Sequence, residues 1–275
     1  MNVHNSIYRC ALPCSGGWVH VAGGLREIDV GETEVWGVNS HDDIYVRPAD
    51  GSGNWKHIGG KLRHVSVGRE AIWGVNSAHN IYRCNLPCTG GWINVPGALM
   101  EVDVAHDVRY QYPTVFGVNS GYSIYKNTQD ASAGWAKVPG GLKYASAGAD
   151  WVWGTNTHDN IYRCKQPCSG SWHQVEGKLM QLDVGENEVW GVNSAHNIYK
   201  RPVDGTFLGS SEFFLFVASP SFSSPSFSFF LLMSLILDRS HVLLRTNRQR
   251  ELATSPRRIN TRQRWQSLCL GSECP

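Results

Sequence analysis

Charge is scarce in this sequence, and neither sign dominates it. Charged residues make up 17% of the 275-residue chain, and the formal net charge is +2. A nucleic-acid-binding surface usually requires a marked excess of lysine and arginine. The composition therefore argues against nucleic acid as a partner.

Recognisable catalytic and targeting motifs are also lacking. The sequence contains no Gly-x-Ser-x-Gly, no His-x-x-x-His pattern and no isolated cysteine suited to be a nucleophile. Residues 1–31 lack the basic start and apolar stretch of a signal peptide. We therefore expect neither an enzyme nor a metal or other cofactor. If the protein is secreted, we expect this chain to be either a mature form or an incomplete gene model.

Glycine and tryptophan, in contrast, are abundant, and they occur in a repeat. Val-Trp-Gly-Val-Asn-Ser at 35–40 recurs with small changes at 72–77, 115–120, 152–157 and 189–194. The intervals between the central aromatics are 37, 43, 37 and 37 residues, and extra residues around 105–113 account for the longest one. A fixed period of this length indicates a repeat architecture. The repeat aromatics are Trp36, Trp73, Phe116, Trp153 and Trp190.

Each copy of the repeat contains four short segments rich in β-branched and aromatic residues. The first begins at a tryptophan, the second contains Leu-x-x-Val/Ile, the third is the Trp-Gly-Val-Asn segment, and the fourth contains Ile-Tyr. Segments of this kind, separated by glycine and asparagine, predict strands, and four antiparallel strands make one propeller blade. We predict an all-β propeller with five complete four-stranded blades. Asn5–Tyr8 supplies one strand of a sixth, so we expect incomplete ring closure.

Cysteines mark alternate repeats in the frame Ile-Tyr-Arg-Cys-x-x-Pro-Cys. Local disulfides, free buried thiols and a metal site are the three interpretations. We favour disulfides in an oxidising compartment, because zinc sites usually bring Cys-x-x-Cys pairs together in fours. The expected disulfide residues are Cys10, Cys14, Cys84, Cys88, Cys164 and Cys168. A fourth pair, Cys269 and Cys274, lacks this frame.

The composition changes abruptly after Gly205, in the middle of a repeat. A run rich in serine, phenylalanine and leucine is followed by an arginine-rich segment. We predict a propeller over 1–205 and a non-homologous tail over 206–275, disordered or aberrantly translated. A membrane span near 212–237 is the alternative, but Pro220, Pro225 and several serines argue against it.

The repeat resembles the tectonin repeat, through Trp-Gly-Val-Asn-Ser-x-x-x-Ile-Tyr. With the cysteine frame between alternate blades, it is similar to the fish-egg lectins from about Val3 to Gly205. That resemblance implies a secreted lectin of innate defence that binds N-acetylglucosamine and related bacterial surface glycans. Membranes would be reached only through their glycans, and a homo-oligomer would add valency. The alternative is an intracellular tectonin scaffold for proteins or lipids, which reduced cysteines would favour.

Sugar binding needs aromatic faces together with amides or hydroxyls. The repeat aromatics could stack on a ligand, but we favour packing between blades. The asparagine that ends the third segment could contact sugar, but we favour a cap on the following turn. The polar turns themselves are the best candidates for ligand contact. The candidate sugar-binding residues are Asn39, His41, Asp42, Asn76, His79, Asn80, Asn156, His158, Asp159, Asn193, His196 and Asn197.

Three further sets of polar residues are weaker candidates for a binding site. The copy with Phe116 carries Gly121-Tyr122-Ser123 in its turn, so a site there should differ or be absent. Asp42 and Asp43 are too few for calcium, which takes six to eight oxygen ligands. A recurring polar position inside the second segment is expected to be a structural hydrogen-bond partner. Its residues are Asp29, Ser66, Asp103, Ser146 and Asp183.

Overall fold

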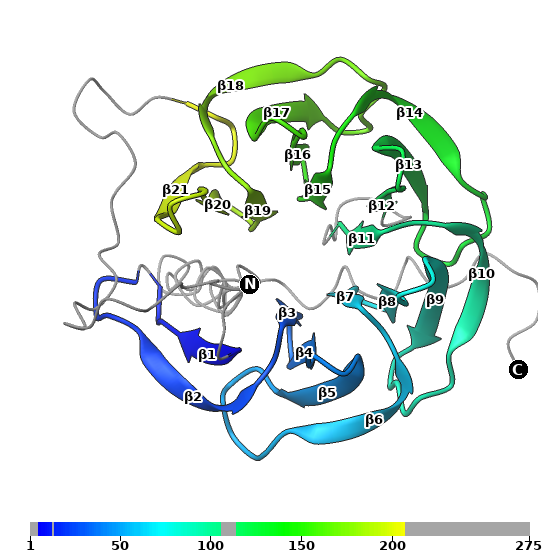
Figure 1. Cartoon of the computed structure of the whole chain (residues 1–275), viewed down its shortest axis with the longest axis vertical. Coiled ribbons are helices and arrows are strands. Elements are labelled where there is room, and N and C mark those ends of the chain that lie inside the picture. The colour runs from blue at the N-terminus through cyan, green and yellow to red at the C-terminus, as the bar shows by residue number, and fades with distance from the viewer. Residues whose placement is uncertain (1–4, 13, 106–113, 207–275) are drawn as a thin grey trace, which may run out of the picture. The chain divides into compact units, whose positions relative to one another are not determined.

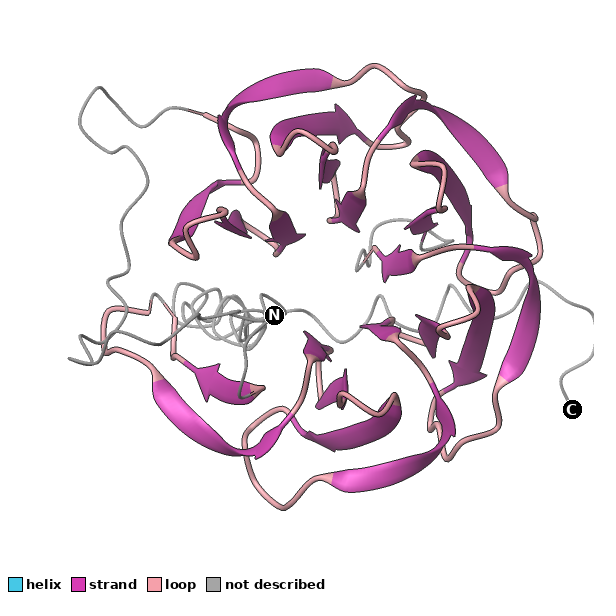
Figure 2. Ribbon diagram, viewed as in Figure 1, coloured by secondary structure: helices cyan, strands magenta, loops and turns pink. Residues whose placement is uncertain are grey.

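The structure is a computed structural model that describes residues 5–12, 14–105 and 114–206. Within these ranges every regular element is a β-strand, and there are 21 of them (Figure 2). A search of the same residues finds no helix with the length and apolarity needed for a membrane span. Nearly all of the predicted tail, including Cys269 and Cys274, lies outside the described residues.

Four sheets are complete antiparallel blades of four strands. In each, the strands follow one another from the inner edge of the sheet to the outer edge (Figure 1). Blade 1 comprises β3 (Glu27–Val30), β4 (Glu34–Val38), β5 (Asp43–Pro48) and β6 (Lys56–Lys61). Blade 2 comprises β7 (His64–Val67), β8 (Ala71–Val75), β9 (Asn80–Asn85) and β10 (Ile93–Ala98). Blade 3 comprises β11 (Glu101–Val104), β12 (Thr114–Val118), β13 (Ser123–Thr128) and β14 (Ala136–Gly141). Blade 4 comprises β15 (Tyr144–Ala147), β16 (Trp151–Thr155), β17 (Asn160–Lys165) and β18 (His173–Lys178).

Two smaller sheets complete the described structure. Blade 5 has three strands, β19 (Gln181–Val184), β20 (Glu188–Val192) and β21 (Ile198–Pro202), and β1 (Ser6–Arg9) pairs with β2 (Val19–Gly24). Each inner strand contacts the next from β3 through β7, β11 and β15 to β19. The predicted all-β propeller of four-stranded blades is confirmed, and four of the five blades expected to be complete have all four strands within the described residues.

The boundaries between blades do not coincide with the boundaries between the sequence repeats. The segment that begins at a tryptophan does not open its own blade but forms the outer strand of the preceding one. β2 thus pairs with β1, and β6 pairs with β5. The sequence order alone cannot show where one sheet ends, because all consecutive segments are joined by similar short connections. The strand at Asn5–Tyr8 accordingly has an outer partner.

The two-stranded sheet packs against both of its neighbours in the ring. Ile7 of β1 and Val21 of β2 pack with Leu25 and Ile28 of blade 1. On the other side, the disulfide-bonded Cys10 and Cys14 join the core of blade 5 around Trp190. Side-chain packing therefore spans the gap left by the inner strands of a sixth blade, which are missing from the described residues.

The repeat aromatics lie in the interior between blades. Their exposed fractions are 1% for Trp36, 0% for Trp73 and Phe116, 1% for Trp153 and 3% for Trp190. The indole of Trp73 donates to the carbonyl of Gln129 in blade 3 (3.2 Å), and that of Trp153 donates to Val203 beyond β21 (3.1 Å). These aromatics are therefore core residues that join neighbouring blades.

A second set of tryptophans joins the outer strands. The indole nitrogen of Trp55 donates to Ala22, that of Trp92 to Gly59 and that of Trp172 to Pro139, over 2.9, 2.7 and 2.7 Å. A Cβ atom at Gly60, where φ is +112°, would meet the Trp92 indole at 2.7 Å. The glycine near the end of β2, β6, β10 and β14 therefore leaves room for the tryptophan that precedes the next outer strand.

Disulfides close the three predicted loops. Cys10 pairs with Cys14, Cys84 with Cys88, and Cys164 with Cys168, and all six cysteines are buried. In two of the three loops the arginine before the first cysteine reaches the following blade, whereas Arg83 donates to Asn85 of its own strand. Arg9 donates to the carbonyl of Asp50 (3.1 Å), and Arg163 donates to that of Asp204. At these two loops, an arginine beside the disulfide therefore connects its sheet to the next blade.

The glycine after each repeat aromatic should be intolerant of a side chain. A Cβ atom at Gly154 would lie 2.4 Å from Leu142 Cδ1 and 2.6 Å from the Tyr144 carbonyl, whereas one at Gly59 meets nothing within 4 Å. We predict that Gly154→Ala lowers the free energy of unfolding by about 2 to 3 kcal/mol through overpacking. Chemical denaturation measures the change, with Gly59→Ala as the control. Equal unfolding midpoints for the two variants would contradict the packing described here.

Candidate functional site

The inner strands carry a ring of polar side chains that hydrogen-bond from blade to blade. Each accepts from a backbone amide of the following inner strand, whose edge would otherwise be unpaired. The donors and acceptors are Val67 to Asp29 (2.6 Å), Val104 to Ser66 (3.0 Å), Ala147 to Asp103 (2.6 Å) and Val184 to Ser146 (3.0 Å). These side chains therefore act as structural hydrogen-bond partners, the role predicted from the sequence for their positions.

Burial makes this ring electrostatically unusual. Desolvation, reinforced by the charges of Asp183 and Asp29, raises the pKa of Asp103 to about 8. Burial likewise raises the pKa values of Glu27 and Glu101 well above their ordinary range. Carboxyl groups kept protonated in this way act as hydrogen-bonding groups at neutral pH without the cost of buried charge.

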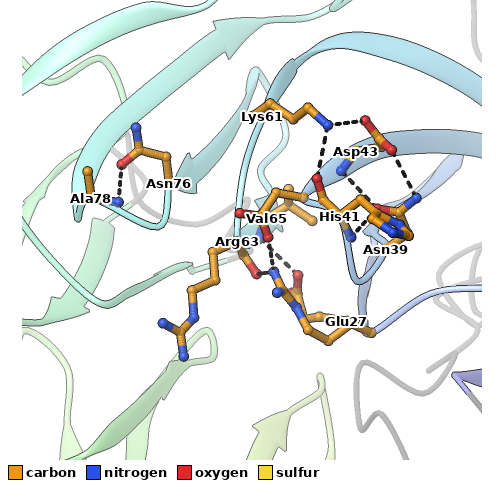
Figure 3. Close-up of polar contacts among 11 residues, drawn as sticks. Glu27, Asn39, His41, Asp43, Lys61, Arg63, Val65, Asn76 and Ala78 are labelled. Carbon is orange, nitrogen blue, oxygen red and sulfur yellow. Dashed lines mark hydrogen bonds and ion pairs between the residues drawn. The ribbon is translucent and has the colours of Figure 1, made fainter. Parts of the chain in front are cut away.

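The candidate binding residues lie in the turns between the second and third strands of the blades. In every turn the asparagine Oδ1 accepts from the backbone amides two and four residues later. For Asn39 these donors are His41 and Asp43, both at 2.9 Å (Figure 3), and for Asn76 they are Ala78 and Asn80, at 3.0 and 2.9 Å. Asn119, Asn156 and Asn193 repeat the pattern. The asparagines therefore cap the turns.

The three residues after each asparagine form a rigid projection. The third of them has φ near +60°, in the left-handed region, and its carbonyl accepts from the leucine that starts the next blade in blades 1 to 4. Histidines do not all occupy one turn position. His41 and His158 stand second after the asparagine and are exposed, whereas His79 and His196 take the left-handed position and are partly buried.

Blade 1 surrounds its turn with paired charges. Asp42 forms a 2.9 Å salt bridge with Arg26, and their side chains are 23% and 27% exposed. Lys61 on the outer strand donates to Asp43 (2.5 Å) and to the His41 carbonyl (2.9 Å), as Figure 3 shows. Hydrogen bonds from Lys61 and Asn39 lower the pKa of Asp43, which keeps this carboxylate ionised.

Blade 4 repeats this arrangement. Asp159 pairs with Lys143, which occupies the position of Arg26, and both side chains are about one quarter exposed, at 28% and 26%. Lys178 donates to the His158 carbonyl (2.8 Å) and to Asn160 Oδ1 (2.6 Å). The turns of blades 1 and 4 are thus the two that combine an aspartate–cation pair, an exposed histidine and an outer-strand lysine.

The other three turns lack this set. The register places Ala98 in blade 2 and Gly141 in blade 3 opposite the positions that pair with lysine in blades 1 and 4. Blade 3 also has the exposed Tyr122 in place of a turn histidine or aspartate. In blades 2 and 5, His79 and His196 follow an alanine. The structure therefore divides the predicted turns into two kinds.

Sequence reasoning missed the four cations beside the turns, which are Arg26, Lys61, Lys143 and Lys178. Each lies on a different segment from the turn it contacts. A Gly-Lys pair at the same repeat position, 60–61 and 177–178, is the signal that could have identified the two outer lysines.

Metal binding finds no support in this geometry. Asp42 and Asp43 face different cations, Arg26 and Lys61, instead of converging on one point. Across the described ranges, no group of three or more His, Cys, Asp or Glu side chains is arranged to hold a metal ion.

Comparison with known proteins agrees with the repeat. Residues 25–209 match the tectonin domain family. No curated protein compared with the chain matches its sequence. Because the family match covers well over half of its length, the chain belongs to the tectonin family.

Solved structures similar to this chain are propellers of distant sequence. Saccharomyces cerevisiae Prp20p aligns with a TM-score of 0.50 at 6% identity, covering 67% of this chain and 62% of that protein. The Cps50 (Swd1) propeller of Myceliophteria thermophila aligns with a TM-score of 0.50 at 8% identity, covering 66% of each chain. Human WBSCR16 aligns at 8% identity with a TM-score of 0.49, covering 65% of this chain and 62% of that protein. The likenesses to Prp20p and Cps50 show the fold alone. The aligned part spans less than two thirds of the length of the human and yeast proteins.

The buried acid ring predicts a pH-dependent stability. A folded-state pKa near 8 against an ordinary value of 3.8 means that folded Asp103 binds the proton more tightly, so stability falls as pH rises between these values. Burial lowers the pKa of His64 to about 4. This shift makes stability rise with pH, but only up to the ordinary histidine pKa of 6.5. We therefore expect the melting temperature to fall between pH 6.5 and 8.5.

Asp103→Asn tests the origin of this fall. Its amide can accept from Ala147 and donate to Ser66 at any pH, so the decline should become shallower, by about a third or more, in calorimetric scans. Asp50→Asn, which alters an exposed carboxylate with a lowered pKa, is the control and should leave the decline unchanged. An unchanged pH profile in Asp103→Asn would contradict the assignment.

Proposed function

We propose that this tectonin-family chain is a carbohydrate-binding protein, without enzymatic activity, whose main sites are the turns of blades 1 and 4. The observation that carries the proposal is the recurrence of one polar set, an aspartate–cation pair with an outer-strand lysine and an exposed histidine, around two asparagine-capped turns. Recurrence on a rigid frame favours a binding role over chance surface charge.

The chemistry of the set suits sugar hydroxyls. A hydroxyl both donates and accepts, so a carboxylate and a cation held side by side can each make a charge-assisted bond to vicinal hydroxyls. Asp42 and Asp159 are held by their cations and by a left-handed backbone, which lowers the entropy cost of binding. The neighbouring histidines offer ring faces and edges to the apolar side of a sugar.

The proposed ligands are N-acetylglucosamine-type or bacterial surface glycans, and the proposed setting is extracellular, in innate defence. The fish-egg-lectin resemblance of the repeat and cysteine frame suggests this ligand class. Three closed disulfides support an oxidising compartment, because such bonds rarely persist in the cytosol.

Repetition would raise the strength of binding to a glycan surface. Single sites of this exposed kind bind weakly, on the order of millimolar, but two sites on one rigid ring act together on a multivalent surface. Blades 1 and 4 are separated by blades 2 and 3. The protein would therefore recognise dense arrays of sugar better than single molecules.

A protein-binding scaffold is less well supported. Yeast Prp20p is described with binding to Gsp1p and histones, but its likeness to this chain is in fold only. The large hydrophobic residues exposed in the described structure are Val19 on β2, Ile93 on β10 and Tyr122 in the turn of blade 3, so they lie apart from one another in sequence and in blade. Single exposed hydrophobic residues are ordinary and do not mark a protein interface.

Affinity chromatography tests the proposal. We expect the folded protein to be retained on immobilised N-acetylglucosamine and eluted by the free sugar, and the Asp42→Asn/Asp159→Asn double variant to lose about tenfold or more in affinity, as two charged contacts are removed. The Asp50→Asn/Asp130→Asn double variant, which removes two exposed carboxylates beyond the ends of β5 and β13 that lie away from the turns, is the charge-matched control. Flow-through of folded wild-type protein, or full retention of the double variant, would contradict the proposal.

A further inference from the structure

The turns of blades 1 and 4 differ by one charge at equivalent positions. The strand register pairs Asp43 with Lys61 in blade 1 and Asn160 with Lys178 in blade 4. The lysine geometry is otherwise the same, since both ammonium groups also donate to the carbonyl of the turn histidine. The set in blade 1 therefore pairs two cations with two carboxylates, whereas the set in blade 4 pairs two cations with one.

Lys178 is thus held in place by neutral acceptors alone. Its hydrogen bonds go to the His158 carbonyl and the Asn160 amide oxygen, and it is exposed on the outer strand. The acid of blade 4's own turn, Asp159, is bonded to Lys143. Glu176, two residues before Lys178, acts on Arg201, whose pKa its charge raises against the larger effect of burial. The positive charge of Lys178 is fixed in position and available to an anion.

From this difference we infer that the blade 4 turn binds an acidic sugar, whose carboxylate or phosphate group is placed between Lys178 and His158. The inference rests on the proposed carbohydrate-binding function and adds a substrate class to one of its sites. In blade 1, Asp43 already neutralises Lys61 and would repel an anion, so that turn takes neutral sugars. The two turns of one ring would then bind two different parts of a glycan that contains both neutral and acidic sugars.

Two reciprocal substitutions isolate the charge while keeping the shape. Asn160→Asp preserves an acceptor for Lys178 and neutralises it, which makes blade 4 resemble blade 1. Asp43→Asn does the reverse in blade 1. Gln174→Glu adds the same charge on an exposed position of β18, four residues from Lys178 and so about 13 Å along the strand.

Titration calorimetry with N-acetylglucosamine, glucuronic acid and glucose 6-phosphate measures the preference of each variant, expressed as the ratio of its neutral-sugar to acidic-sugar dissociation constants. The wild type should prefer at least one acidic ligand, and the tighter one identifies the group recognised. Asn160→Asp should reduce this ratio about fivefold, the upper range for one exposed ion pair. Asp43→Asn should raise the number of acid-preferring sites from one to two, and Gln174→Glu should change the ratio less than twofold.

The outcomes separate this inference from the function on which it rests. Wild-type protein that binds N-acetylglucosamine, with an acidic preference that is absent or unchanged by Asn160→Asp, overturns the inference and leaves the lectin proposal standing. Folded protein that binds none of the three sugars overturns both. A reduction of equal size in Gln174→Glu would assign the preference to overall charge and also overturn the inference.

Discussion

The hydrogen bonds between inner strands are the constraint on which the rest of the structure depends. A propeller leaves the inner edge of each blade facing its neighbour, with amide groups that water cannot reach. Here a side chain supplies the missing acceptor, as when Asp103 accepts from Ala147 of the next blade. Because the same position serves in successive blades, one local interaction is repeated around the ring, and burial raises the pKa of the Asp103 carboxyl within it to about 8.

Because these hydrogen bonds and the packed aromatics hold the blades together, the side chains of the turns can differ between blades without destabilising the fold. The asparagine caps hold the backbone of all five turns alike, whereas the side chains around them differ from blade to blade. Only the turns of blades 1 and 4 gain an aspartate–cation pair and an outer lysine among the described residues. Binding specificity can thus reside in a few side chains, while the repeat aromatics and inter-blade bonds preserve the ring.

Much of this was predictable from residue patterns, because the repeat aromatics, the capping asparagines and the cysteine frame each recur at a fixed interval. The all-β propeller and the four strands per unit followed directly. The boundaries between the blades could not be predicted, because only the hydrogen bonding shows that Lys56–Lys61 is the last strand of blade 1. The cations beside the turns also escaped prediction. Arg26 and Lys61 are brought to Asp42 and Asp43 by sheet register and blade packing, which no local pattern records.

The central functional claim is that the capped turns of blades 1 and 4 contact sugar. Amide chemical-shift mapping of isotope-labelled protein during titration with N-acetylglucosamine tests it most directly, because each turn amide reports its own surroundings. The account predicts that the largest shifts cluster at residues 41–43 and 158–160 and at their neighbours Lys61 and Lys178, with small changes at the equivalent turn of blade 3. Shifts concentrated elsewhere on the propeller, or none at saturating sugar, would contradict it.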